Sequence, residues 1–110
     1  RIFWFSGGRE NPIEGDFYIG SADWMYRNLN TRVEVATPVE APPLRRRLWE
    51  ILQIALDDRR QVWEMRSDGT YEQRTPEGLD ADDPMALGAH QRLMAATVAH
   101  YEARLQSDAE

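Results

Sequence analysis

Residues 17–28 constrain the fold more than any other part of this chain. Phe17, Tyr18 and Ile19 form a short apolar run of aromatic and β-branched residues, which predicts a strand. The pattern stops at Gly20, and small residues, an acid and an aromatic residue follow before an Arg-Asn pair. Small residues after a strand let the backbone approach a ligand closely. A strand that ends in a turn of this composition is therefore a candidate site for an anion.

Two interpretations of this turn remain open. In the first, the side chains of Ser21 and Asn28 line an anion site, and Arg27 supplies a fork of donors that suits phosphate oxygens. In the second, Trp24 is a core residue and Asp23 caps a turn or a helix, so the segment has no chemical role. Short strand-turn-helix segments are common, and physical reasoning alone does not separate the two.

The sequence pattern of this stretch resembles a known family. The run Gly-Ser-Ala-Asp-Trp-Met-x-Arg-Asn-Leu-x-x-Arg-Val-Glu, at residues 20–34, resembles the C-terminal region of bacterial polyphosphate kinases. Residues 1–8, the Ala-Thr-Pro at residues 36–38 and the apolar pattern of residues 44–52 are also similar to that family. The resemblance extends over residues 1–75 and is faint beyond them.

The resemblance implies an activity and a fold. Polyphosphate kinases reversibly move the terminal phosphate of ATP onto inorganic polyphosphate through a phosphorylated histidine, in a fold like that of phospholipase D, with Mg²⁺. Both essential histidines of the family would precede residue 1, so no residue of this chain is predicted to be catalytic. The chain would then be a fragment that is inactive alone and binds no cofactor by itself.

The resemblance also selects candidate site residues. Four matching positions carry side chains suited to bind phosphate or substrate: Ser21, Arg27, Asn28 and Arg32. Two acids, Asp23 and Glu34, are expected to orient them, and no metal ligand is predicted. For Arg32 and Glu34 the alternative is an ordinary cross-strand charge pair, because both fall on one face of a strand predicted there.

Composition limits the other functions that this chain could have. The net charge of −6 argues against non-specific nucleic-acid binding, which usually needs a basic face. No apolar run approaches the length of a membrane span, and no signal-peptide pattern is present. The absence of cysteine fits a reducing compartment, so a cytoplasmic location is expected. His90 and His100 lack neighbours at metal-ligand spacing and are predicted to lie at the surface.

The pattern of apolar residues predicts an α+β fold. It consists of a small mixed or antiparallel sheet, two helices and a hairpin. The resemblance to polyphosphate kinases implies that these elements are part of a larger phospholipase D-like domain. Three strands are expected, at residues 1–6, 16–21 and 31–37. A helix over residues 42–59 has one apolar stripe, formed by Leu44, Leu48, Ile51, Leu52, Ala55 and Leu56. The arginines at 45–47 spread around this helix and are expected to be solvated.

The remaining residues predict a hairpin and a final helix. Asp68-Gly69 between two β-like segments is a strong hairpin signal, and Asp83-Pro84 combines a helix cap with a proline at the first helical position. Three regions follow: residues 1–75 as the end of a catalytic domain, residues 76–83 as an acidic linker, and residues 84–110 as a C-terminal helix.

Two rival functions and several partners complete the predictions. The first rival is a phosphodiesterase of the phospholipase D type, which needs a His-x-Lys element. This chain contains no lysine, but a preceding part of a longer protein could supply that element. A non-catalytic module for polyanion binding or assembly is the second rival. The expected partners are inorganic polyphosphate, ATP or ADP, the remaining domains of a longer chain and further copies in a homo-oligomer, with Mg²⁺ and ATP serving the full-length enzyme.

Overall fold

The computed structural model describes residues 1–107 of the chain, and its fold is α+β as predicted. The chain divides into two units, Arg1–Leu52 and Gln53–Glu110, which are described separately below. One helix, α2 (Pro42–Leu56), contributes residues to both units. None of the described helices combines the length and apolar character that crossing a membrane requires.

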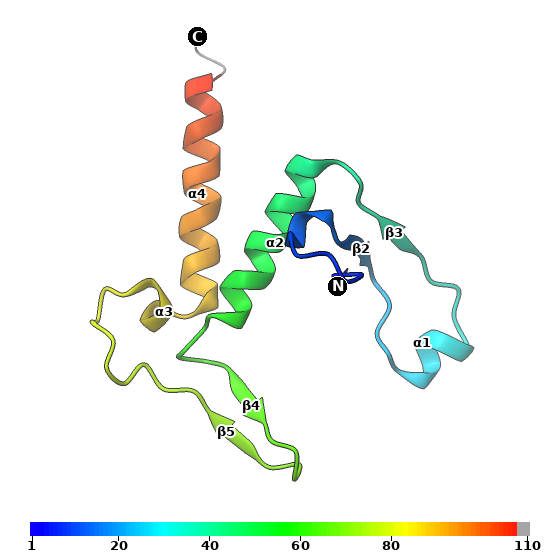
Figure 1. The fold of residues 1–110 in the computed structure, drawn as a ribbon, viewed down its shortest axis with the longest axis horizontal. Coiled ribbons are helices and arrows are strands. Elements are labelled where there is room, and N and C mark those ends of the chain that lie inside the picture. Colours follow the sequence, from blue (N-terminus) through cyan, green and yellow to red (C-terminus); the bar gives the residue numbers. More distant parts are fainter. Residues whose placement is uncertain (108–110) are drawn as a thin grey trace. The chain divides into compact units, whose positions relative to one another are not determined.

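A three-stranded antiparallel sheet organises the first unit (Figure 1). Its strands are β1 (Ile2–Phe5), β2 (Asp16–Gly20) and β3 (Ala36–Pro38), with β2 in the middle. The predicted antiparallel pairing of the first two strands is confirmed, with Phe3 opposite Tyr18. The loop between them contains the short 3₁₀ helix η1 (Pro12–Glu14).

The third strand is shorter than the predicted span of residues 31–37, and that prediction is wrong in its first half. Regular pairing begins only at Ala36, which lies opposite Gly20, the last residue of β2. Residues 31–35 have no neighbouring strand to pair with, because the chain leaves the sheet after Gly20. Val33 is fully exposed, so the alternation of apolar residues here did not reflect a buried face.

The core of the first unit forms where β1 and β2 meet α2. Phe17 is 1% exposed, and the ring of Trp4 packs on Trp49 of α2 with centroids 4.6 Å apart. The indole Nε1 of Trp4 donates a hydrogen bond to the carbonyl of Pro12 at 2.9 Å, as expected of a partly buried indole. Arg45 is not simply solvated as predicted, because it donates to the carbonyls of Val39 and Ile13.

The apolar stripe predicted for α2 is only partly correct. The helix begins at the predicted residue, Pro42, but ends at Leu56 rather than Arg59. Its buried residue is Ile54, which the predicted stripe omitted, while Leu44 and Leu56 at the two ends are more than half exposed. Helical periodicity gives the spacing of apolar residues, but it does not say which of them the rest of the chain covers.

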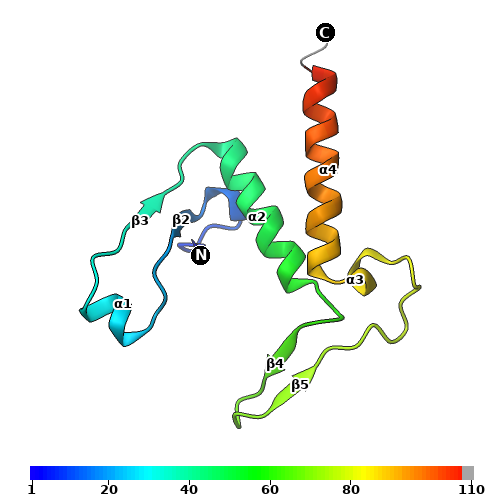
Figure 2. The same ribbon diagram turned by 180° about the vertical axis from the view of Figure 1, so that it is seen from behind.

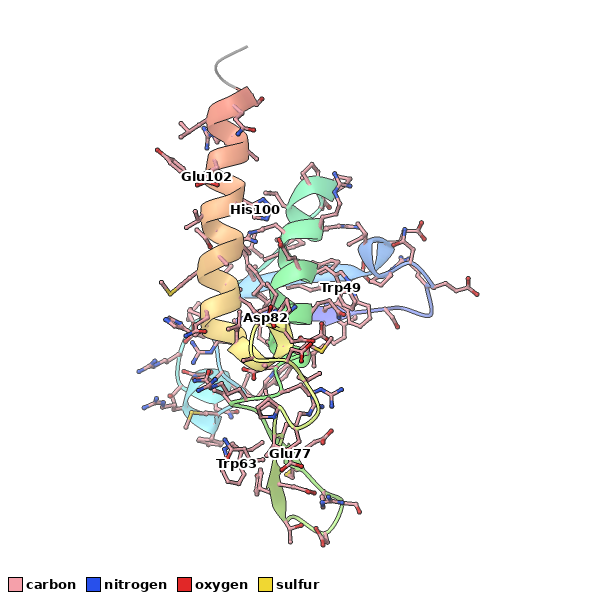
Figure 3. The ribbon with its side chains drawn as sticks, turned by 90° about the vertical axis from the view of Figure 1, so that its left-hand side faces the viewer. Trp49, Trp63, Glu77, Asp82, His100 and Glu102 are labelled. Carbon is pink, nitrogen blue, oxygen red and sulfur yellow. The ribbon has the colours of Figure 1, made fainter. Side chains whose placement is uncertain are left out.

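The second unit contains the hairpin that the Asp-Gly signal predicted (Figure 2). Its strands are β4 (Trp63–Met65) and β5 (Tyr71–Gln73), and Gly69 in the turn has a φ of +83°. Figure 3 shows Trp63 on this hairpin, where its side chain is 58% exposed. The hydrogen-bonded ion pair between Arg74 and Glu64, 3.0 Å long, lowers the pKa of the Glu64 carboxyl.

Two helices end the described part of the chain, where one was predicted. α3 (Pro84–Leu87) begins as expected, since the Asp83 carboxylate accepts the N–H of Met85 at 2.8 Å. Gly88, with a φ of +82°, then separates it from α4 (Ala89–Ser107). A residue with this backbone conformation cannot continue a helix, so α3 ends before Gly88. The pattern of apolar residues did not reveal this break, because it says nothing about the φ angle of a single glycine. Figure 3 shows His100 on α4.

Asp58 is the most buried polar residue among those described, and no sequence pattern indicated its role. It is 1% exposed, and its carboxylate accepts the N–H groups of Arg60 at 2.6 Å, Gln61 at 2.9 Å and Ala89 at 2.8 Å. Burial alone would raise the pKa of Asp58, but these donors and the charge of Arg92 outweigh it and lower the pKa. Asp58 therefore fastens the segment after α2 to the start of α4.

We expect Asp58→Asn to loosen this junction at neutral pH by about 1–3 kcal/mol, because an amide cannot satisfy three buried donors. A lowered folded-state pKa stabilises the fold above the unfolded pKa, and this stabilisation is lost as the pH falls through the folded-state value. Amide hydrogen exchange should therefore speed up at residues 58–61 and 88–92 at neutral pH, and the difference from the parent should shrink in acid.

Asp57→Asn is the matched control for this prediction. Asp57 is only partly buried, and its ion pair with Arg92 is 3.9 Å long. Loss of such a pair costs little, so exchange at the same amides should change far less. Equal effects of the two substitutions, or an effect of Asp58→Asn that grows in acid, would contradict the role given to Asp58.

Candidate functional site

All six candidate residues from the sequence lie in one loop, residues 21–35, which we call the site loop. It leaves the sheet after Gly20 and returns at Ala36, and these two residues are paired, so the loop closes at its neck. A Cβ added to Gly20 would lie 2.6 Å from the carbonyl oxygen of Val35, which shows how closely the two ends approach. Figure 1 shows helix α1 (Tyr26–Asn30) within this loop.

A side-chain hydrogen bond also joins the two ends of the site loop. The hydroxyl of Ser21 donates to the carboxylate of Glu34 at 2.8 Å. The strand required by the cross-strand alternative for Arg32 and Glu34 is absent at these residues. Glu34 therefore has a serine as its hydrogen-bond partner, not the neighbouring arginine suggested by the sequence.

A second contact holds the middle of the loop. Arg32 donates from Nη1 to the Oδ1 atom of Asn28 at 3.4 Å. Asn28 lies in α1 and is 5% exposed, whereas Arg32 is exposed. The structure thus brings together Asn28 with Arg32, and Ser21 with Glu34, as two separate pairs.

Asp23 and Arg27 have different surroundings. The carboxylate of Asp23 forms an ion pair with Nε of Arg1 at 2.5 Å, and Arg1 lies beside Gly20 in the sheet. The guanidinium of Arg27 is exposed and has no hydrogen-bond or ion-pair partner among residues 1–107. Its backbone carbonyl accepts both the N–H and the hydroxyl of Thr31, so the helix turn that carries Arg27 is anchored.

The structure does not support the second interpretation of this turn, in which Trp24 is a core residue and Asp23 is a helix cap. Trp24 is 76% exposed and is not a core residue, although its ring meets that of Phe3 edge-on with centroids 5.9 Å apart. Asp23 does not cap α1, whose N-cap is Met25 and lacks a side-chain cap. The residue that sequence reasoning missed is Arg1, because only the strand register brings it beside Gly20 and within reach of Asp23.

An apolar hollow of about 320 Å³ lies beside the loop, and Phe3, Phe5, Tyr18, Trp24 and Leu29 contribute to its walls. Asp23 is the only one of the six candidate residues that borders it. Such walls cannot solvate a phosphate, because an unpaired charge is costly beside apolar groups. The hollow is therefore distinct from any anion site that the loop provides.

No cluster of three or more histidine, aspartate or glutamate side chains in residues 1–107 is placed to hold a metal ion. The site loop offers two exposed guanidinium groups, those of Arg27 and Arg32. The backbone of Arg27 is anchored through its carbonyl, and Arg32 is held by the hydrogen bond of its side chain to Asn28. Groups of this kind bind phosphate oxygens.

Comparisons with known proteins identify relatives of this chain. Residues 1–83 match the family model for the polyphosphate kinase C-terminal domain 2. A polyphosphate kinase of Synechocystis is 57% identical over 69% of this chain and 10% of its own length. That of Parasynechococcus marenigrum is 53% identical over 76% of this chain and 11% of its own length. A polyphosphate kinase of Thermosynechococcus vestitus is 48% identical over 89% of this chain and 12% of its own length.

The chain thus spans about a tenth of the length of these relatives. No solved structure matches it. The matched residues 1–83 include the whole sheet, the site loop and the hairpin.

Proposed function

Because this chain belongs to the polyphosphate kinase family, we propose that it is part of an enzyme that reversibly transfers the terminal phosphate of ATP to inorganic polyphosphate. We further propose that the transfer proceeds through a phosphohistidine in a phospholipase D-like fold. A cytoplasmic location and a homo-oligomeric state remain predictions from the sequence.

One observation carries this proposal more than any other. The site loop lies entirely within the residues that match the family, and it presents Arg27 exposed and without a partner among the described residues. An arginine whose guanidinium makes no hydrogen bond or ion pair with the described residues can bind a ligand without breaking such a contact among them. Its planar fork of donors suits the oxygens of a phosphate group.

The other candidate residues would support this role. Arg32 would also hold phosphate oxygens, while Asp23 and Glu34 would keep the neighbouring groups in place through Arg1 and Ser21. Phosphoryl transfer depends chiefly on positioning and on stabilising the charge of the transferred group, so such residues can matter without taking part in bond making. Mg²⁺ and ATP would serve the whole enzyme.

We expect the isolated 110-residue chain neither to hydrolyse ATP nor to form polyphosphate. No predicted nucleophile is among its residues, and charge stabilisation alone transfers no phosphate without one. The measurement is release of labelled phosphate from ATP and formation of acid-insoluble label, with and without added polyphosphate. Autophosphorylation of the isolated chain would contradict this prediction.

A chimaera supplies the positive control and tests the function itself. Residues 1–83 would replace the matching segment of one of the related polyphosphate kinases. The chimaera should form polyphosphate from ATP and should not cleave a phosphodiester such as bis-p-nitrophenyl phosphate. A folded chimaera that has lost the kinase activity, or that cleaves the phosphodiester instead, would refute the proposed function.

A further inference from the structure

The site loop has an unusual distribution of buried and exposed side chains. Leu29 is 56% exposed, Tyr26 is 77% exposed and Val33 is fully exposed, whereas Asn28 is 5% exposed. Asn28 is the one buried residue of this loop. A loop that exposes its large apolar side chains and buries an amide is not held in place by apolar packing, so its polar contacts must define its shape.

Those polar contacts lead to one exposed group. The Oδ1 atom of the buried Asn28 accepts a hydrogen bond from Nη1 of Arg32 at 3.4 Å. Arg32 lies in the stretch 31–35, which has no helix or strand to fix its direction. Because a guanidinium has five donors, one bond to Asn28 restricts the orientation of the group and leaves donors for a ligand.

We propose that Asn28 is a positioning residue, which acts on the phosphate only through Arg32. This inference rests on the proposed function and deepens it, because it separates the group that touches phosphate from the buried group that aims it. The amide oxygen suits this task better than a carboxylate would, since it orients the guanidinium without neutralising its charge.

The test is a double-mutant cycle in the active chimaera that carries residues 1–83. Arg32→Ala should lower kcat/KM for polyphosphate synthesis by about a hundredfold, because it removes a phosphate donor. Asn28→Leu should lower it by about ten- to a hundredfold, because a misplaced group loses much of its effect. In the double variant, the loss should be within about threefold of that of Arg32→Ala alone, since coupled residues are not additive.

Conservative and control variants separate positioning from a merely structural effect. Asn28→Asp keeps an oxygen acceptor for Arg32, so its kcat/KM should be at least about threefold above that of Asn28→Leu, but below that of the parent because a carboxylate partly neutralises the guanidinium. Asn30→Leu is the control, because Asn30 is a nearby exposed asparagine of α1 that donates to the carbonyl of Tyr26 and not to Arg32. This variant should keep kcat/KM within about threefold of the parent. Should Asn28→Leu fail to fold by circular dichroism, Asn28→Ser keeps a polar group but is too short to reach Nη1.

The possible outcomes are distinct. If Arg32→Ala is inactive while folded Asn28→Leu and Asn28→Ser are fully active, the positioning role is overturned and the proposed function stands. If the losses of Asn28 and Arg32 variants multiply in the double variant, Asn28 acts independently and the inference also fails. If Arg32→Ala is fully active, the phosphate-binding role proposed for Arg32 fails, and the positioning role of Asn28 fails with it, while the role proposed for Arg27 stands or falls on its own variant.

Discussion

Arg27→Ala is expected to lower the turnover of a polyphosphate kinase that carries this chain by at least about a hundredfold. The guanidinium of Arg27 is exposed and has no hydrogen-bond or ion-pair partner among residues 1–107, so its removal breaks no polar contact that the structure shows. A donor aimed at the transferred phosphate is worth about 2.7–4 kcal/mol in the transition state. The measurement is the steady-state rate of polyphosphate formation, with unfolding temperatures to establish that the variant is folded.

Arg46→Ala is the matched control for this substitution. Arg46 is an exposed arginine on α2, and its replacement changes the net charge by the same amount. It lies outside the site loop, so turnover should stay within about twofold of the parent. Near-normal turnover of folded Arg27→Ala would contradict the phosphate-binding role of Arg27. An equal loss of turnover in both variants would show that the change in net charge, not the loss of a site, is responsible.

The sequence was most reliable where a local rule fixes the backbone. The Asp-Gly pair gave the hairpin because its turn needs a residue with positive φ, which Gly69 supplies. The cap formed by Asp83 and the start of α2 at Pro42 follow from equally local chemistry. Such features depend on a few adjacent residues and need no knowledge of the tertiary structure.

The sequence failed where the answer depends on distant residues. Alternation at residues 31–35 predicted a strand, but a strand also needs a partner, and β2 ends at Gly20. The sequence did not reveal that Asp58 joins the segment after α2 to α4, because one of its hydrogen-bond donors, Ala89, is distant in the sequence. The candidate site lies between these cases: its residues could be selected from the sequence, but their pairing across the neck of the loop could not.

Gly15 shows how a tertiary contact can impose a residue that no local rule requires. Its φ of −63° is ordinary for any residue, so replacement by alanine should by itself stabilise the protein by about 0.4–1 kcal/mol. However, a Cβ at this position would lie 2.5 Å from Nε1 of Trp4 and 2.7 Å from the carbonyl oxygen of Phe5. The structure therefore predicts that Gly15→Ala destabilises the protein, whereas the backbone conformation alone predicts that it stabilises it.

We expect Gly15→Ala to destabilise the first unit by about 1–3 kcal/mol through overpacking. Roughly a further 1 kcal/mol should be lost if the indole of Trp4 is displaced from the carbonyl of Pro12. Denaturant unfolding, together with hydrogen exchange over β1 and β2, measures the effect in a protein that carries the chain. Trp4→Phe removes the indole nitrogen, so Gly15→Ala should cost less in that background, although the clash with Phe5 persists. A stabilising effect of Gly15→Ala would mean that β1 and the turn before β2 are not packed as closely as the structure shows, and the register that brings Arg1 beside Gly20 would lose its support.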